Sequence, residues 1–218
     1  TLPDSKTFPQ NKVLTTNGSN KIQLDLQIPS ETEYTQPYWL KETGTTGMYI
    51  VKDQKNIGIP DVIRETKVVF NIRIDEIEIP FERTIVYKYN DDVKGEMYNY
   101  LDVVPDVTTS IIDKVSLFRD TKMKYTAVKI KAGKDNVKGN LQLELPKSWK
   151  VLPTSIPFEL EKKGSEQTFY FEVTPPNSPE ETVVKSVAIV NGKRFDQEQI
   201  IIDFNHITKQ QVLKTSES

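Results

Sequence analysis

The chain contains a single histidine, His206, which is the first residue to consider for catalysis or metal binding. A zinc site uses three or four histidine, cysteine or carboxylate ligands, and a nucleophilic triad needs a histidine beside an activated nucleophile. With 1 His and 0 Cys, disulfides and cysteine-based chemistry are excluded. We therefore expect no catalytic residue, no metal ligand and no cofactor. We interpret His206 as a side chain that packs where the chain leaves its last strand.

Two acidic clusters have the residue types for carboxylate chemistry. Asp91-Asp92, followed by Gly95-Glu96, could supply oxygen ligands to calcium, but the run lacks EF-hand spacing, and such clusters are common in turns. Asp75-Glu76 could contribute to a glycosidase pair, whose two carboxyl groups must face each other roughly 5–10 Å apart. Alternation places most strand acids on solvated faces, so we interpret both clusters as turns.

The aromatic residues Tyr34, Tyr38 and Trp39 are the candidate ligand-binding residues, because flat aromatic faces on loops stack on sugar rings. The competing interpretation is structural packing, since Tyr and Trp are mostly buried in folded proteins. Trp149, which follows Leu145-Pro146, is predicted to fill the core.

Composition describes a polar chain of 218 residues, long enough for two domains of about 100 residues each. Hydrophobic residues make up 36% and charged residues 28%, with 29 Lys and Arg against 31 Asp and Glu and a net charge of −2. Nucleic-acid binders carry a basic stripe or face. We therefore expect no nucleic-acid partner, and since no apolar run approaches the roughly 18 residues that span a bilayer, no membrane insertion.

The clearest structural signal lies between residues 137 and 176. Leucines alternate with polar residues in Leu141-Gln-Leu-Glu-Leu145, and apolar residues alternate again in Phe169-Tyr-Phe-Glu-Val173. This period of two is typical of strands that bury one face. Asn191-Gly192 predicts a tight hairpin, because both residues tolerate positive φ. The strands expected here are residues 109–118, 124–131, 139–145, 156–161, 166–174, 182–190 and 193–203, a spacing typical of an immunoglobulin-like or fibronectin-like sandwich.

The first half also has β patterns. Residues 21–28 alternate cleanly, residues 48–51 predict a short strand, and residues 65–89 form the longest β pattern, with a turn at Asp75-Glu76. The predicted fold is therefore all-β, with two tandem immunoglobulin-like or fibronectin-like β-sandwiches. Residues 1–105 form the first sandwich with a polar N-terminal lead, residues 106–204 the second, and residues 205–218 a C-terminal linker, with the boundary and hinge at Pro105.

Several stretches resemble the middle region of large bacterial proteins that carry an LmbE-like (PIG-L) N-acetylglucosaminyl deacetylase domain. They are Thr35-Gln-Pro-Tyr-Trp-Leu-Lys41, Tyr87-Lys-Tyr-Asn-Asp-Asp-Val-Lys-Gly-Glu96, Leu101-Asp-Val-Val-Pro105 and Ile202-Asp-Phe-Asn-His-Ile207. Leu145-Pro-Lys-Ser-Trp149 with Val173-Thr-Pro-Pro176 is similar to the NPCBM-associated NEW3 sandwich. The resemblance covers about residues 30 to 213.

The His-Pro-Asp-Asp zinc-binding run of that family is missing from this sequence. The resemblance therefore implies non-catalytic accessory modules that position a neighbouring deacetylase domain or contact other domains of the same polypeptide. The alternative is a carbohydrate-binding module whose loop aromatics bind glycan. The resemblance also implies an exported, periplasmic or extracellular protein. The N-terminus has no initiating Met and no signal-peptide pattern, and we expect the chain to be a segment of a longer protein.

Overall fold

The structure is a computed structural model that describes residues 7–8, 12–29, 31–60, 62–64, 66–204 and 206–218. The chain divides into two compact units, each made of two segments. One unit comprises Thr1–Tyr34 and Arg64–Val103, and the other comprises Thr35–Ile63 and Val104–Ser218. The division after Val103 lies close to the boundary predicted at Pro105. The grouping of Thr35–Ile63 with the C-terminal half was not predicted.

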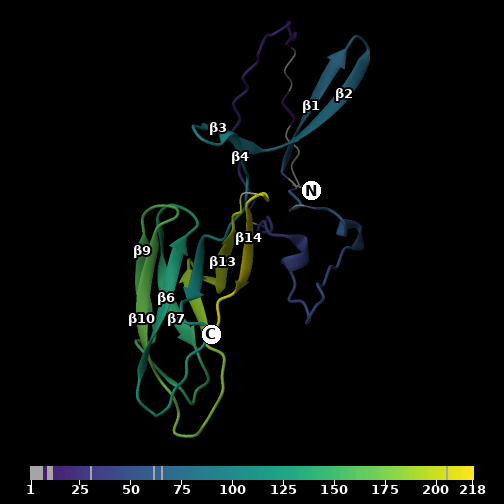
Figure 1. The fold of residues 1–218 in the computed structure, drawn as a ribbon. Helices are drawn as coiled ribbons and strands as arrows, with labels where there is room; N and C mark the ends of the chain where they lie inside the picture. The colour runs from purple at the N-terminus through teal and green to yellow at the C-terminus, as the bar shows by residue number, and fades with distance from the viewer. Residues whose placement is uncertain (1–6, 9–11, 30, 61, 65, 205) are drawn as a thin grey trace. The chain divides into compact units, whose positions relative to one another are not determined.

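The larger unit is an all-β sandwich-type fold that contains two antiparallel four-stranded sheets (Figure 1). The first sheet has the order β5-β6-β10-β8, with β5 at Val107–Ile111, β6 at Lys124–Ala132, β10 at Glu166–Thr174 and β8 at Lys150–Leu152. The second has the order β12-β11-β7-β9, with β12 at Lys193–Phe195, β11 at Lys185–Val190, β7 at Val137–Glu144 and β9 at Ile156–Leu160.

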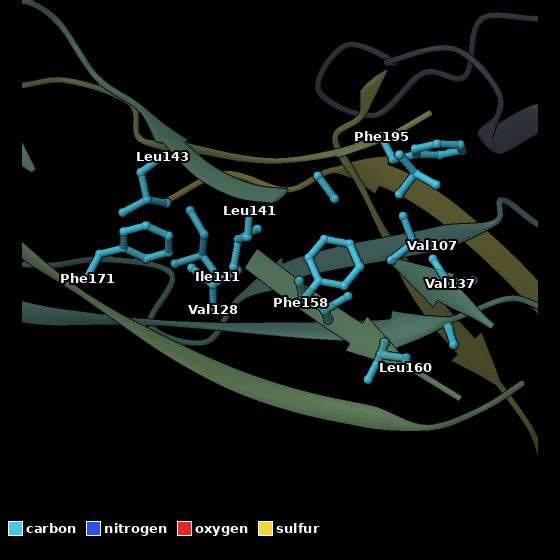
Figure 2. Close-up of a cluster of buried hydrophobic side chains, with 14 of the residues drawn as sticks. Val107, Ile111, Val128, Val137, Leu141, Leu143, Phe158, Leu160, Phe171 and Phe195 are labelled. Atoms are coloured by element: carbon cyan, nitrogen blue, oxygen red, sulfur yellow. The ribbon is translucent and has the colours of Figure 1, made fainter. Parts of the chain in front are cut away.

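Alternate side chains of both sheets fill one core. In β6 the buried residues are Thr126, Val128, Ile130 and Ala132, while the residues between them are partly exposed. Figure 2 shows Phe171 of the first sheet and Leu141 of the second in the same cluster. Both are 0% exposed. Each fully buried Leu or Phe stabilises the fold by about 1.5–3 kcal/mol, so the alternation seen in the sequence is the main source of stability.

The predicted hairpin at Asn191-Gly192 is confirmed. These residues have φ values of 49° and 77°, and they join β11 to β12 with Val190 opposite Lys193. Positive φ at both central positions is the requirement of a type I′ turn, whose twist matches the flanking strands.

The C-terminal segment is not the linker that the sequence predicted. β14 (Gln210–Thr215) pairs antiparallel with β13 (Gln197–Ile202), and the two strands lie side by side in Figure 1. Val212 and Leu213 are only 2% and 6% exposed. Past β14, Ser216 donates its backbone N–H to the carbonyl of Asp196, and Ser218 exchanges two backbone hydrogen bonds with Val184. The end of the chain is therefore part of the sandwich.

Residues Thr35–Ile63 pack with this C-terminal strand. The Nε2 of Gln211 donates to the carbonyl of Thr35 at 2.6 Å, and the Oε1 of Gln36 accepts from the backbone N–H of Leu213 at 3.2 Å. Pro37 beside them is fully buried. The segment contains two short 3₁₀ helices, η1 (Tyr38–Leu40) and η2 (Gln54–Asn56). The strand predicted at residues 48–51 is reduced to an isolated bridge between Thr45 and Met48.

The smaller unit contains two hairpins where the sequence predicted a complete sandwich. β1 (Lys67–Ile74) pairs with β2 (Ile77–Thr84), and β3 (Val86–Asp91) pairs with β4 (Gly95–Tyr100). The turn predicted at Asp75-Glu76 is confirmed. Residues 21–28 belong to no strand in the described structure, and the N-terminal lead at residues 1–6 and 9–11 lies outside the described residues. Alternation therefore located the hairpins, but it did not predict which segments find a pairing partner.

Candidate functional site

Two of the three aromatic candidates form a local pair. Tyr38 and Trp39 belong to η1, are half-buried, and meet edge to face with ring centroids 4.9 Å apart at an interplanar angle of 88°. The hydroxyl of Tyr38 donates to the carbonyl of Ile59 at 3.2 Å, which ties η1 to the far end of the same segment. Because the rings are perpendicular, Tyr38 and Trp39 do not form a flat two-ring platform. Tyr34 belongs to the smaller unit and is 38% exposed.

Trp149, predicted to fill the core, packs at its margin. It is half-buried and meets Phe118 edge to face, with centroids 5.3 Å apart at 79°. Its indole Nε1 is buried without a hydrogen-bond partner among the described residues. Trp149 therefore closes one end of the core by packing.

The acidic run after Asn90 serves a turn. The Oδ1 of Asp91 accepts hydrogen bonds from the backbone N–H groups of Lys94, at 2.8 Å, and Val93, at 2.9 Å. These two donors, that of Lys94 first, lower the pKa of the Asp91 carboxyl. One oxygen of the carboxylate is thus occupied in closing the β3–β4 hairpin, as the turn interpretation predicts.

Several acids of the sandwich surface form ion pairs. Glu144 of β7 and Arg194 of β12 form a bidentate ion pair, in which the Nη2–Oε2 distance is 2.9 Å. The carboxylate of Asp196 lies 3.3 Å from the Nε of the same guanidinium. The hydrogen bonds from Arg194 lower the pKa of Glu144, and the same bonds raise the pKa of Arg194. Glu198 accepts from Ser110 at 2.8 Å and lies 2.5 Å from the Nζ of Lys114.

Three hydroxyl groups from distant parts of the sequence meet inside the sandwich. Ser186 donates to the Oγ1 of Thr109 at 2.9 Å, and its Oγ lies 2.5 Å from that of Ser216. The Oγ of Ser216 also accepts from the backbone N–H of Ile111 at 3.2 Å. Thr109, Ser186 and Ser216 are all 0% exposed. We name them the hydroxyl trio. No sequence pattern marks the trio, and its burial and pairing make it structural.

His206 lies on the surface after β13. It is exposed and stacks on Phe204, with ring centroids 5.9 Å apart at 26°. Among the residues that the structure describes, no group of three or more His, Asp or Glu side chains is arranged to hold a metal ion. Its described ring contact is the stacking on Phe204.

Two exposed tyrosines that the sequence analysis missed share the outer face of the first sheet. Tyr125 of β6 and Tyr170 of β10 are each 60% exposed. Tyr125 lies opposite Glu172 and donates to its Oε1 at 3.3 Å, and Tyr170 lies two residues away on the same face of β10. Diagonal neighbours of this kind are about 7–8 Å apart. Their place in the period-two pattern could have identified them.

A shallow depression of about 470 Å³ lies over the β7–β9 pair, lined by Lys138, Gly139, Asn140, Pro157, Phe158 and Glu159. Its polar groups are those of an ordinary sheet surface. The candidate aromatic residues Tyr34, Tyr38 and Trp39 do not line this depression.

No protein-family model matches this chain, and a search of curated proteins finds no match to it. No described helix is both long enough and apolar enough to span a membrane.

Proposed function

We propose that this chain is a non-catalytic accessory region whose immunoglobulin-like sandwich holds neighbouring domains of the same polypeptide at a fixed separation. The observation that carries the proposal is that the first and the last segments of the larger unit both hydrogen bond to its strands and loops. Thr35 and Gln36 hydrogen bond to β14, and the residues after β14 pair with Asp196 and Val184. The segment at Thr35 and the segment after β14 are both held to the sandwich, which suits a unit that keeps neighbouring parts of the polypeptide at a fixed separation.

The chemistry-bearing side chains support the same proposal. Asp91 caps a turn, Glu144 pairs with Arg194, and the hydroxyl trio is buried and hydrogen bonded. A general acid, base or nucleophile must instead reach a reacting group in a water-accessible cleft. The resemblance described above extends the proposal: the domain served is an LmbE-like sugar N-deacetylase, and the protein is exported.

The test is an acetate-release assay on the purified chain with N-acetylglucosamine oligosaccharides, with and without added zinc. The expected result is no acetate above the buffer rate under either condition. Acetate release that scales with protein concentration would contradict the non-catalytic assignment. A positive control is a full-length protein that contains the deacetylase domain.

A second candidate function is carbohydrate binding, favoured by the exposed pair Tyr125 and Tyr170. Isothermal titration with soluble glycans compares two double variants, Tyr125→Ala/Tyr170→Ala and Tyr38→Ala/Trp39→Ala. Binding that only the first variant abolishes assigns the site to the sheet face, and binding that only the second abolishes assigns it to η1. Absence of binding by the unmodified chain would leave the scaffold function.

A further inference from the structure

The β3–β4 hairpin contains one sequence pattern twice. Tyr-x-Tyr-x-Asp occurs at residues 87–91 of β3 as Tyr-Lys-Tyr-Asn-Asp, and again at residues 98–102 as Tyr-Asn-Tyr-Leu-Asp, which begins in β4. Residues two apart on a strand lie on one face. Tyr98 lies opposite Lys88, and Tyr87 lies opposite Asn99. The tyrosines of the two copies therefore lie on opposite faces of the hairpin.

The second copy of the pattern binds a cation of this chain. The Cζ of Arg64 lies 4.1 Å from the centroid of the Tyr100 ring, and the Nε of Arg64 lies 3.5 Å from the Oδ1 of Asp102. The Arg64 side chain is only 7% exposed. A guanidinium is attracted by the face of an aromatic ring and pairs with a carboxylate. The second tyrosine and the aspartate of the pattern thus hold an arginine side chain together.

The first copy has the equivalent residues without a cation from the neighbouring strand. Met97 lies opposite Tyr89, and Gly95 lies opposite Asp91. A Cβ added to Gly95 would meet no atom within 4 Å outside its chain neighbours, so the space over Gly95 is open. The backbone N–H of Lys94 lowers the pKa of Asp91 more than the charge of the Lys94 side chain does. In the described part of the chain no ion pair joins Asp91 to a Lys or Arg side chain, so Asp91 is an ionised carboxylate beside open space.

Tyr87 adds an exposed ring to this face. Its ring stacks on that of Tyr89, with centroids 5.6 Å apart at an interplanar angle of 22°, and Tyr87 is 68% exposed. A planar guanidinium stacks on aromatic rings and forms two parallel hydrogen bonds with a carboxylate. Tyr87, Tyr89 and Asp91 therefore present stacking rings and a negative charge on one face, and this combination is complementary to a guanidinium.

We propose that Tyr87, Tyr89 and Asp91 bind an arginine side chain presented by a partner polypeptide. The negative charge of Asp91 selects a cation, and the repeated pattern selects arginine, because its second copy holds Arg64. The guanidinium of the partner stacks on the exposed tyrosine pair and pairs with the Asp91 carboxylate. This contact goes beyond the scaffold function proposed above and does not depend on it.

The test is an NMR titration of the chain, isotopically labelled in its tyrosine rings, at low ionic strength so that salt does not screen the charges. The probe is the capped peptide acetyl-Gly-Arg-Gly-amide, and its control contains citrulline, the uncharged analogue of arginine, in place of arginine. Tyr49 is the first reference inside the chain, because it is 67% exposed and has no acid two residues away. Tyr100 is the second reference, because Arg64 already lies over its ring. Asp91→Asn removes the charge and keeps an oxygen that accepts the hydrogen bonds of the turn.

The arginine peptide should shift the ring signals of Tyr87 and Tyr89 about threefold or more beyond those of the two reference tyrosines. The citrulline peptide should shift all four tyrosines alike, and Asp91→Asn should reduce the response of Tyr87 and Tyr89 to that of the references. Equal shifts at all four tyrosines, the same shifts with citrulline, or an undiminished response in Asp91→Asn would overturn the proposal. A Tyr87 signal that changes when the chain alone is diluted would assign the face to a second copy, which also overturns it. Circular dichroism verifies that Asp91→Asn retains its β structure.

Discussion

The side-chain Nε2 of Gln211 donates a hydrogen bond of 2.6 Å to the carbonyl oxygen of Thr35, across 176 positions of sequence. The Oε1 of Gln211 accepts from the Nε2 of Gln199 at 2.7 Å, so the 4% exposed amide is paired at both of its ends. This side chain joins the segment before η1, β13 and β14 into one structure.

Gln211→Ala should destabilise the sandwich by about 1–3 kcal/mol, because it removes one hydrogen bond to the half-buried Thr35 and one from the half-buried Gln199. The measurement is urea unfolding followed by circular dichroism. Lys214→Ala, at an exposed position of the same strand, is the control and should change the free energy of unfolding by less than about 0.5 kcal/mol. Equal effects of the two substitutions would show that the Gln211 network contributes nothing specific.

Val212→Asp tests whether β14 is buried. Val212 is 2% exposed, and an unpaired carboxylate in such a position costs about 3–5 kcal/mol. Lys214→Asp introduces the same group at an exposed position of β14, two residues further along the strand. We expect loss of most folded protein for the first variant and near-normal thermal unfolding for the second. A linker, by contrast, would tolerate both substitutions equally.

Ser216→Ala tests the hydroxyl trio. It removes the acceptor of the backbone N–H of Ile111 and the partner of Ser186, and we expect a loss of about 1–3 kcal/mol. Thr215→Ala, on the exposed neighbouring residue, is the matched control. The measurement is the midpoint of chemical denaturation of the two variants. If Ser216→Ala leaves the free energy of unfolding unchanged, the trio is not a stabilising network.

Glu144→Gln tests the ion pair with Arg194. The pKa of Glu144 is lowered in the folded protein from its ordinary value of 4.5, so the pair stabilises the fold above that pH and loses its effect as the pH falls through the folded pKa. Both side chains are nearly half exposed, which limits the contribution to less than about 1 kcal/mol. Stability measured from pH 7 to pH 3 should therefore show a small difference that disappears in acid. A difference that grows in acid would have the wrong sign for this pair.

The sequence predicted the strands with strong alternation and missed those whose existence depends on distant partners. Leu141 and Leu143 of β7 and Phe171 and Val173 of β10 point into the core because a period of two commits one face of each strand to burial. β8 has only three residues, Lys150–Leu152, too few for a pattern.

β14 contains the polar pair Gln210-Gln211, which is typical of a linker. Gln211 is nevertheless buried, because its side chain hydrogen bonds to Thr35 and Gln199, which are distant in sequence or on another strand. Residues 21–28 show the converse, since they alternate but belong to no strand among the residues that the structure describes. The candidate site residues differ in the same way, between roles set by near neighbours in sequence and roles set by distant partners. The turn role of Asp91 is set by neighbours two and three residues away and was predictable, whereas the trio of Thr109, Ser186 and Ser216 is formed by the fold alone.

Hydrogen–deuterium exchange on the unmodified chain tests most directly whether the C-terminal strand is an integral part of a rigid scaffold. The account predicts that the amides of β14 exchange as slowly as those of β6 and β11, because all three open only when the sandwich unfolds as a whole. Rapid exchange of Val212 and Leu213 beside a protected β6 would contradict it, and would return residues 205–218 to the role of a linker.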